Sequence, residues 1–206
     1  MNVQHNDSLL LLNLQQQLRF SRHNDDTQAS VLIAITRESD PKVLLTRRSM
    51  HLSSHAGEVS FPGGKRDPED SSNIAVALRE AYEETALKPQ DVELIGDLPV
   101  QHSRKGLSVK PIVGLIPASV QLIAQPTEID RIFFVSLREL MDAPTIPYAV
   151  QWQQQTLYFP SMRVNNEIIW GLTARMLVSL FKYGLRYDKD WPVLLESTNI
   201  QQLNSG

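Results

Sequence analysis

Three glutamates and an arginine lie close together in the segment REAYEE, residues 79–84. Glu80, Glu83 and Glu84 have i, i+3 and i+4 spacing, so on an α-helix their carboxylates lie on one side. On a bare helix these charges repel and weaken it by a few tenths of a kcal/mol per pair, roughly. A divalent cation would reverse that effect, because Mg²⁺ and Mn²⁺ favour carboxylate oxygens and often bind together with phosphates. The alternative is an ordinary solvent-facing side of a helix, the usual location of a single Glu.

The flanking residues favour the metal interpretation. The helix has apolar residues at i, i+3, i+4 and i+7, which predicts one buried stripe: Ile74, Ala77, Leu78 and Ala81. Arg79 lies one turn before Glu83 and is spaced to hold that carboxylate, although an exposed pair of this kind contributes little. Upstream, FPGGK places two glycines where the backbone turns tightly or approaches a ligand, and a free carbonyl there can bind a metal.

The remaining chain predicts a mixture of strands and helices around this segment. We expect an amphipathic helix over residues 7–20, capped by Asp7 or Ser8, then a polar linker. Strands are predicted at 29–38 and 42–48 as a hairpin, at 92–100 and 109–117 around a polar loop, and at 128–135. A short helix at 136–142 and a long buried helix at 167–185, closing at Gly184, follow. This order predicts an α+β fold, an α/β/α sandwich around a mixed sheet.

Composition limits the classes of function. With 206 residues and 42% hydrophobic content, we expect one domain, residues 1–206, with its core at about 28–186. The formal net charge of −3 predicts neither a nucleic-acid partner nor a membrane partner. The sequence has no cysteine, which excludes disulfides and thiolate chemistry, and no apolar run approaches the ~18 residues of a membrane helix. We therefore expect a cytoplasmic protein.

Together, Gly64, Arg79, Glu80, Glu83 and Glu84 resemble the Nudix box, G-x5-E-x7-R-E-U-x-E-E-x-G-U, where U is a bulky aliphatic residue. Nudix hydrolases cleave nucleoside diphosphates linked to another group, using a loop-helix-loop that binds divalent metal. The sequence departs from the box at four points. Asp70 replaces the first Glu, one extra residue precedes Arg79, Ala81 fills the first aliphatic position, and Ala86 replaces the last Gly. The departures question the role of Asp70 and leave the metal-binding residues intact.

A second stretch, LLTRRSMHLSSHAGEVSFPGG at residues 44–64, resembles the signature L-L-T-x-R-[S/A]-x3-R-x3-G-x3-F-P-G-G of the coenzyme A pyrophosphatase-type Nudix hydrolases. That group also tolerates the lengthened box. Ser53 replaces the usual second Arg, so one basic contact is missing. WGLTA, residues 170–174, resembles the carboxy-terminal segment of the same group. Trp170 is interpreted as a core residue rather than an adenine platform, because large aromatic side chains supply much buried area.

The resemblance implies roles for residues at the matching positions. Glu80 and Glu84 would bind Mg²⁺ or Mn²⁺, with Glu83 a further ligand and the Gly64 carbonyl a weaker one. Arg79, Glu80 and Glu83 form the predicted catalytic set, and the general base is left open between a box residue such as Glu80 and a later acidic residue. Glu128 stands near that later position, or is an exposed glutamate at a strand start. Cationic side chains predicted to meet the substrate phosphates are Arg47, Arg48, His55 and Lys65, with His51 a weaker candidate.

The resemblance predicts a metal-dependent pyrophosphohydrolase that splits coenzyme A or its thioesters into adenosine 3′,5′-bisphosphate and a 4′-phosphopantetheine compound. One alternative is a Nudix pyrophosphatase for another nucleotide substrate, such as NADH, ADP-ribose or a dinucleoside polyphosphate. The other is a non-catalytic nucleotide-binding module, which the intact glutamates argue against. The sequence leaves the oligomeric state open, with a homodimer among the alternatives.

Overall fold

A central mixed sheet organises the protein in the computed structural model, which describes residues 4–21, 27–152 and 155–192. Strands of the main sheet lie in the order β3-β2-β1-β7-β5, while β4 pairs with β1, β6 with β7 and β8 with β2. The bounds are β1 (Ala29–Arg37), β2 (Lys42–Arg48), β3 (Val59–Ser60), β4 (Gly63–Lys65), β5 (Glu93–Asp97), β6 (Gln101–His102), β7 (Ser108–Pro117) and β8 (Ile129–Ser136). Among the described strands only β1 and β7 pair in parallel, so the sheet is mixed as predicted.

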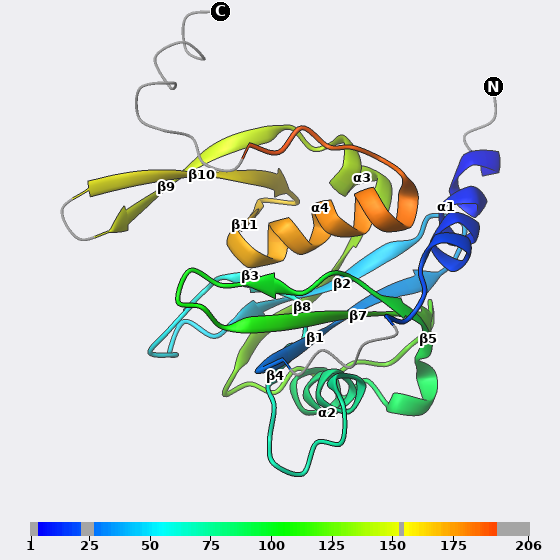
Figure 1. Ribbon diagram of the computed structural model, residues 1–206, viewed down its shortest axis with the longest axis horizontal. Coiled ribbons are helices and arrows are strands. Elements are labelled where there is room, and N and C mark those ends of the chain that lie inside the picture. Colours follow the sequence, from blue (N-terminus) through cyan, green and yellow to red (C-terminus); the bar gives the residue numbers. More distant parts are fainter. Residues whose placement is uncertain (1–3, 22–26, 153–154, 193–206) are drawn as a thin grey trace, which may run out of the picture.

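Helices cover both faces of this sheet (Figure 1). The helix α2 (Asn73–Thr85) lies on one face, and α1 (Gln4–Gln17) and α4 (Gly171–Leu185) lie on the other. Strand β1 serves both sides: Leu32 and Ala34 pack toward α2, and Ile33 and Ile35 pack toward the α1 and α4 side. Burial on both faces explains why this strand reads as a continuous apolar run. None of the described helices is long and apolar enough to cross a membrane.

A second sheet of three strands follows the short helix α3 (Leu137–Asp142). It consists of β9 (Thr145–Trp152), β10 (Gln155–Val164) and β11 (Glu167–Trp170), in the order β11-β10-β9. In Figure 1 the hairpin of β9 and β10 extends beside α4, on the side of the main sheet away from α2. A 3₁₀ turn, η1 (Pro89–Asp91), completes the described elements.

The structure corrects three of the expected boundaries. Helix α1 begins at Gln4, so Asp7 and Ser8 lie inside it and do not cap it. Residues 167–170 form β11 and not the first turn of the last helix, because Gly171 has a φ of 62° that separates strand from helix. That helix ends at Leu185, with Arg186 in the left-handed conformation, whereas Gly184 lets α4 approach α1 closely. A Cβ on Gly184 would lie 2.7 Å from the Leu14 side chain. The central part of the expected polar linker, residues 22–26, lies outside the described residues.

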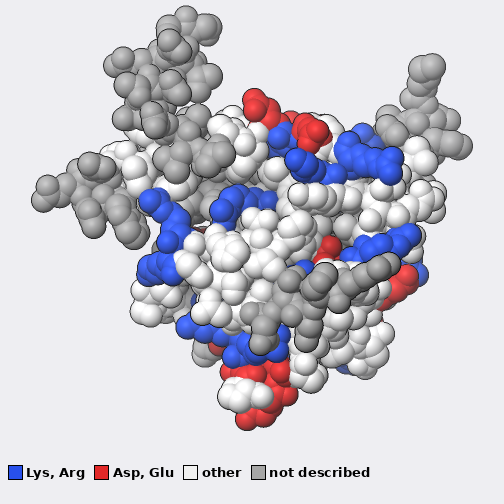
Figure 2. All heavy atoms as spheres, viewed as in Figure 1, with Lys and Arg blue, Asp and Glu red and all other residues white. Residues whose placement is uncertain are grey.

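Charge is distributed in separate groups on the face drawn in Figure 2. On this face the Lys and Arg side chains are interrupted by uncharged and acidic residues.

Candidate active site

Strands β1 and β2 separate where the site is built. They share a register only at Ile35 and Val43, while the start of β1 pairs with β4 and the end of β2 pairs with β3. The loop between β3 and β4 therefore enters the gap between β1 and β2. Its Pro62 carbonyl accepts a hydrogen bond from the Leu32 N–H at 2.9 Å. Gly63 permits this close entry, because a Cβ there would lie 2.5 Å from the Ser30 carbonyl oxygen.

Helix α2 presents its carboxylates to this loop. Ser72 caps the helix by accepting a hydrogen bond from the Ala75 N–H at 3.1 Å. The predicted apolar stripe packs on the sheet, with Ala77 and Ala81 fully buried. Packing of that stripe fixes the rotation of the helix and thereby aims Glu80 and Glu84 at the glycine loop.

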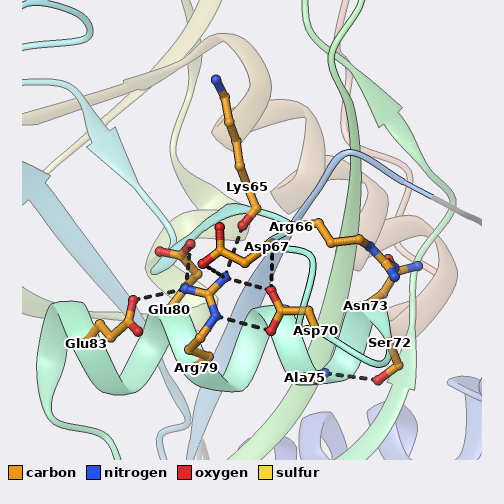
Figure 3. Close-up of polar contacts among 10 residues, drawn as sticks. All are labelled: Lys65, Arg66, Asp67, Asp70, Ser72, Asn73, Ala75, Arg79, Glu80 and Glu83. Carbon is orange, nitrogen blue, oxygen red and sulfur yellow. Dashed lines mark hydrogen bonds and ion pairs between the residues drawn. The ribbon is translucent and has the colours of Figure 1, made fainter.

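Arg79, in the middle of α2, is the centre of an ion-pair cluster between the helix and the loop that precedes it (Figure 3). Its Nη1 donates to Glu80 Oε1 at 3.1 Å and to Glu83 Oε2 at 3.0 Å, and its Nη2 donates to the Lys65 carbonyl at 3.1 Å. One guanidinium thus ties two of the glutamates to the loop after the glycines. The structure brings the predicted catalytic set of Arg79, Glu80 and Glu83 together.

Asp70 holds the other side of the same guanidinium. Arg79 Nε donates to Asp70 Oδ1 at 3.1 Å and Nη2 to Oδ2 at 2.8 Å, a bidentate arrangement. The hydrogen bond from Arg79 lowers the pKa of Asp70, whose side chain is only 6% exposed. The shorter Asp, with one extra residue before Arg79, therefore orients the arginine. The sequence pattern alone had left this role of Asp70 in doubt.

Glu84 is the most buried of the three glutamates, with 4% of its side chain exposed. Its Oε2 accepts a hydrogen bond from the Gly63 N–H at 3.1 Å, and its Oε1 lies 3.7 Å from Arg48 Nη1. Burial raises the pKa of Glu84 to about 8; the Gly63 hydrogen bond and Arg48 oppose the shift, and the charges of Glu80 and Glu128 add to it. A buried carboxylate with so little compensation favours either a proton or a cation.

Glu80 lies directly against the second glycine. A Cβ on Gly64 would lie 2.3 Å from Glu80 Oε1, so only glycine leaves room for this carboxylate. Burial raises the pKa of Glu80, and Arg79 opposes that shift. The position of Gly64 in the sequence pattern is thus explained by a side chain that packs on its Cα.

Glu83 has a different environment from the other two. Its side chain is 55% exposed and is held by Arg79, and among the described residues no three His, Asp or Glu side chains converge on one point. The helical spacing correctly placed the three glutamates on one side, but it did not predict that a guanidinium would separate Glu80 from Glu83.

The two adjacent arginines of β2 point to different partners. They are consecutive residues of β2, so their side chains point to opposite faces of the sheet, and the register shift between β2 and β8 leaves its extra residue, Asp130, on β8. Arg48 lies beside Glu84, and its Nε is buried without a hydrogen bond to any described residue. Arg47 instead contacts Asp130, with Nη2 to Oδ2 at 2.6 Å, and Glu167, with Nη1 to Oε1 at 3.2 Å. The structure therefore places Arg48 at the carboxylates and Arg47 in a separate cluster.

The other predicted cations are more peripheral. His55 is exposed, has a φ of 56°, and its Nδ1 lies 2.9 Å from Glu58 Oε2. His51 is also exposed, and the Lys65 side chain extends away from the Arg79 cluster while its carbonyl binds Arg79 (Figure 3). Glu128 is exposed, yet its negative charge raises the pKa of both Glu80 and Glu84. This proximity favours a site role for Glu128 over an unrelated strand-start position.

Comparison with known proteins identifies the family of this chain. A family model described as NUDIX domain matches residues 26–155, more than half of the chain. The chain belongs to the Nudix family. A relative from Photorhabdus laumondii, named "Uncharacterized Nudix hydrolase NudL", is 42% identical over 160 residues, covering 76% of this chain and 84% of that protein. A protein of the same name from Salmonella paratyphi B is 40% identical over 154 residues, 74% of this chain and 80% of its own length.

Solved structures support the Nudix fold. A MutT/nudix family protein from Enterococcus faecalis superposes with a TM-score of 0.50 at 12% identity, covering 93% of this chain and 78% of that one. At this identity the likeness concerns the fold alone. It agrees with the α+β sandwich predicted from the sequence.

The donor set of the Nudix box fits a divalent cation. Nudix hydrolases generally use such ions, and here Glu80 and Glu84 are hard oxygen donors whose burial and mutual repulsion a cation would relieve. The backbone of Gly64 lies against the Glu80 carboxylate, and the role of its carbonyl as a ligand stays a prediction. Glu83, bound to Arg79 and largely exposed, is the weakest match to the predicted ligand set.

Ala86 stands where the Nudix box has its last glycine, in a backbone conformation that is strained for alanine. Ala86 is the C-cap of α2 with φ 56° and ψ 20°, and its N–H donates to the Tyr82 carbonyl at 2.8 Å. This left-handed conformation is one that glycine adopts without strain and alanine does not. The loop between β7 and β8 also supports the helix end, because the Gln125 N–H donates to the Glu84 carbonyl at 2.9 Å.

A separate cavity lies away from the box. It has a volume of about 680 Å³ and is lined by Asp40, Ser136, Arg138, Glu139, Asp142, Ala143, Arg163 and Val164. It contains none of the predicted site residues. Lys42 pairs with Ser136 at the start of β2, at the opposite end of that strand from Arg48.

Proposed function

We propose that this chain is a metal-dependent pyrophosphohydrolase that cleaves the diphosphate of coenzyme A and its thioesters. Membership of the Nudix hydrolases supports the broader class, hydrolysis of phosphoanhydride bonds. The observation that carries the proposal is the pairing of buried Glu84 with the Gly63 N–H on one side and with Arg48, the matching arginine of the coenzyme A-type signature, on the other.

Each residue of the box has a task that its contacts support. Glu80 and Glu84 would hold Mg²⁺ or Mn²⁺, which when bound neutralises charge on the diphosphate oxygens and orients them for in-line attack. Arg79 fixes Glu80, while Asp70 fixes Arg79. Because both carboxylates are packed against the glycine loop, little reorganisation is needed when the substrate arrives.

Arg48 would bind the substrate's phosphate oxygens. Its ion-pair partner, Glu84, is 3.7 Å away, too far for a hydrogen bond, and its Nε is unsatisfied by the described residues. A guanidinium held in this way has donors to offer to an arriving phosphate. The contacts of Arg47 with Asp130 and Glu167 leave it less suited to that task.

A carboxylate would take the proton from the attacking water. Glu80 and Glu128 are the two candidates, since each acts electrostatically on the box. Glu80→Gln and Glu128→Gln distinguish them. If Glu128 is the base, Glu128→Gln removes the acidic limb of the kcat profile while metal affinity is kept. If Glu128→Gln retains that limb, the base is Glu80, in addition to its role as a metal ligand.

A substrate panel tests the proposal. Coenzyme A, acetyl-coenzyme A, NADH, ADP-ribose and diadenosine tetraphosphate are incubated with Mg²⁺ or Mn²⁺, and products are resolved by chromatography. We expect coenzyme A to give adenosine 3′,5′-bisphosphate and 4′-phosphopantetheine, with ¹⁸O from labelled water in one phosphomonoester and no orthophosphate. A higher kcat/KM for another nucleotide would move the substrate to that compound, and orthophosphate as the first product would overturn the reaction class.

A further inference from the structure

The loop between β7 and β8 is bonded to the last turn of α2. Its Ile123 N–H donates to the Thr85 carbonyl at 2.9 Å, and its Gln125 N–H donates to the Glu84 carbonyl at 2.9 Å. Carbonyls in the last turn of a helix have no partner within the helix, so the loop satisfies both of them. The loop is thereby fixed to Glu84, the residue whose carboxylate is buried against the glycine loop.

The end of this loop, from Gln125 to Glu128, is a tight turn. The Gln125 carbonyl accepts hydrogen bonds from the Glu128 N–H at 3.0 Å and from the Ile129 N–H at 2.8 Å. Pro126 stands at the second position of the turn, where the fixed φ of proline favours the turn conformation. The side chains of residues 125–128 are exposed, so main-chain bonds and the ring of Pro126 hold the turn, and core packing does not.

The far side of the turn is bonded to β2, next to Arg48. Ser49 is buried, and its N–H donates to the Glu128 carbonyl at 2.7 Å. Strand β8 has one extra residue, Asp130, beside the pair of Ile129 with Arg48. This bulge brings Glu128 opposite Ser49, a position that Ile129 would occupy in an unbroken register. The turn is thus attached at both ends to elements that carry site residues.

The Glu128 side chain depends on this main-chain framework for its position. It makes no hydrogen bond or ion pair with any residue in the described part of the chain. Its negative charge nevertheless raises the pKa of both Glu80 and Glu84, so the carboxylate lies close enough to act on the box. Because a misplacement of about 1 Å can cost on the order of 10² in rate, the turn that places Glu128 affects the chemistry.

We propose that Pro126 is a positioning residue, which holds Glu128 beside the two carboxylates of the Nudix box through the turn of residues 125–128. This inference rests on the proposed function, in which Glu128 is one of two candidates for the base. It adds that this candidate has a fixed place, and it names the residue that fixes it. Pro126 acts through Glu128 and does not contact the substrate.

Pro89 provides a matched control. It is also exposed and occupies the second position of a turn, in which the Asp91 N–H donates to the Lys88 carbonyl at 2.9 Å. As in the turn at Pro126, an acidic residue closes the turn and a strand follows, but none of the site residues lies in it. Replacing either proline with glycine should lower the urea midpoint by a similar small amount, because both changes add freedom to the unfolded chain.

Amide hydrogen exchange in EDTA tests whether Pro126 fixes the turn, independently of catalysis. In Pro126→Gly the amides of Ser49 and Glu128 should exchange about 10-fold faster than in wild type, because each is bonded through the turn. In Pro89→Gly both amides should stay within about twofold of wild type. Wild-type exchange of both amides in Pro126→Gly would overturn the inference.

Kinetics in two backgrounds test whether Pro126 acts through Glu128. On the nucleotide substrate that the wild type cleaves, Pro126→Gly should lower kcat by about 10-fold with KM within about twofold. Pro126→Ala, which can adopt the same turn, should stay within about threefold, and Pro89→Gly within about twofold. In a Glu128→Gln background, Pro126→Gly should lower kcat by less than about twofold further. Equal falls of kcat in the two backgrounds, or a wild-type kcat in Pro126→Gly or in Glu128→Gln, would overturn the inference.

The two measurements separate this inference from the proposed function. An active enzyme that shows one of the contrary kinetic results refutes the role of Pro126 and leaves the activity standing. If the wild type cleaves no nucleotide of the panel, the proposed function fails instead, and amide exchange decides alone whether Pro126 fixes Glu128.

Discussion

Replacing Glu84 with glutamine tests whether a buried charge has been retained for function at the expense of stability. The amide of the Glu84→Gln variant would keep an oxygen for the Gly63 N–H while removing the negative charge. The pKa of Glu84 is about 8 in the folded protein against 4.5 for an ordinary glutamate, so the folded state holds the proton more tightly. The contribution of Glu84 to the free energy of unfolding of the metal-free wild type is therefore highest below about pH 4.5, falls as pH rises, and levels off above about pH 8.

The size of the effect follows from that shift. The full difference corresponds to an upper limit of about 5 kcal/mol, because one pKa unit equals about 1.36 kcal/mol. Structural relaxation and water entry around an ionised carboxylate reduce the measurable value, and we expect about 2 kcal/mol. In EDTA at pH 8.5, Glu84→Gln should thus be more stable than wild type by about that amount, and the difference should shrink toward pH 5.

Urea unfolding at a series of pH values in EDTA measures this difference directly. Glu83→Gln is the matched control, since its carboxylate is 55% exposed and its neutralisation should leave the wild-type pH profile unchanged. Adding Mg²⁺ or Mn²⁺ should stabilise wild type by about 2.7 kcal/mol at 100 times Kd, and Glu84→Gln by much less. The same variant should lose on the order of 10² in kcat. Parallel pH profiles for wild type and Glu84→Gln, or a variant that is less stable at pH 8.5, would refute the reasoning.

Three further substitutions probe the surroundings of the box. Asp70→Asn should lower kcat about 10-fold with KM nearly unchanged, because Arg79 loses its bidentate partner; wild-type kinetics would show that Arg79 needs no such support. Ala86→Gly should raise stability by about 1 kcal/mol in urea unfolding by relieving the left-handed conformation, while Ala75→Gly inside the same helix should lower it by a similar amount. Arg48→Met should reduce kcat/KM for coenzyme A by about 10-fold or more at unchanged stability; a loss of stability without a kinetic effect would make Arg48 structural.

Local patterns in the sequence were sufficient for the elements that carry the box. The stripe of Ala77 and Ala81 and the strand at residues 29–38 are predicted directly from the order of apolar residues, and the structure confirms both, the strand as β1. The strands β3 and β4 were not predicted, because two or three residues have no pattern of their own and exist only by pairing with β2 and β1. Tertiary pairing decides their structure.

The second sheet escaped prediction for a different reason. Pro147 and Pro160 interrupt β9 and β10, and prolines usually indicate the absence of a strand. The structure pairs these two prolines directly opposite each other. In an antiparallel ladder alternate pairs exchange no hydrogen bonds, so two facing prolines can occupy such a pair without loss of a bond. Residues 167–170 were misassigned to a helix because a short apolar run has no distinguishing period.

Within the site, helical spacing placed the glutamates on one side and paired Arg79 with Glu83, as the structure confirms, but it could not assign the other partners of Arg79. That Arg79 would bind Asp70, Glu80 and Glu83 together depends on where the loop after Gly64 returns, which is a property of the fold. Burial of Glu84, and with it the raised pKa, depends on the Gly63 loop entering between β1 and β2. Charge and spacing are local, whereas desolvation is set by tertiary packing.

Arg47 and Arg48 show that a sequence motif alone does not assign the partners of its side chains. From the sequence alone both are candidates for the substrate phosphates, yet the alternation of side chains along β2 sends them to opposite faces. Arg47 forms an ion pair with Glu167, whose carboxylate is buried. Without Arg47, the remaining described ion-pair partner of Glu167 is Arg131. Loss of Arg47 should therefore act through the docking of β11. The same contact fixes the start of β11 against the end of β2. A substitution at Arg47 is therefore expected to lower stability through β11, whereas one at Arg48 acts on the binding of the diphosphate. Urea unfolding and kcat/KM measured for Arg47→Met and Arg48→Met separate the two routes, and a kinetic loss in Arg47→Met at unchanged stability would contradict this division.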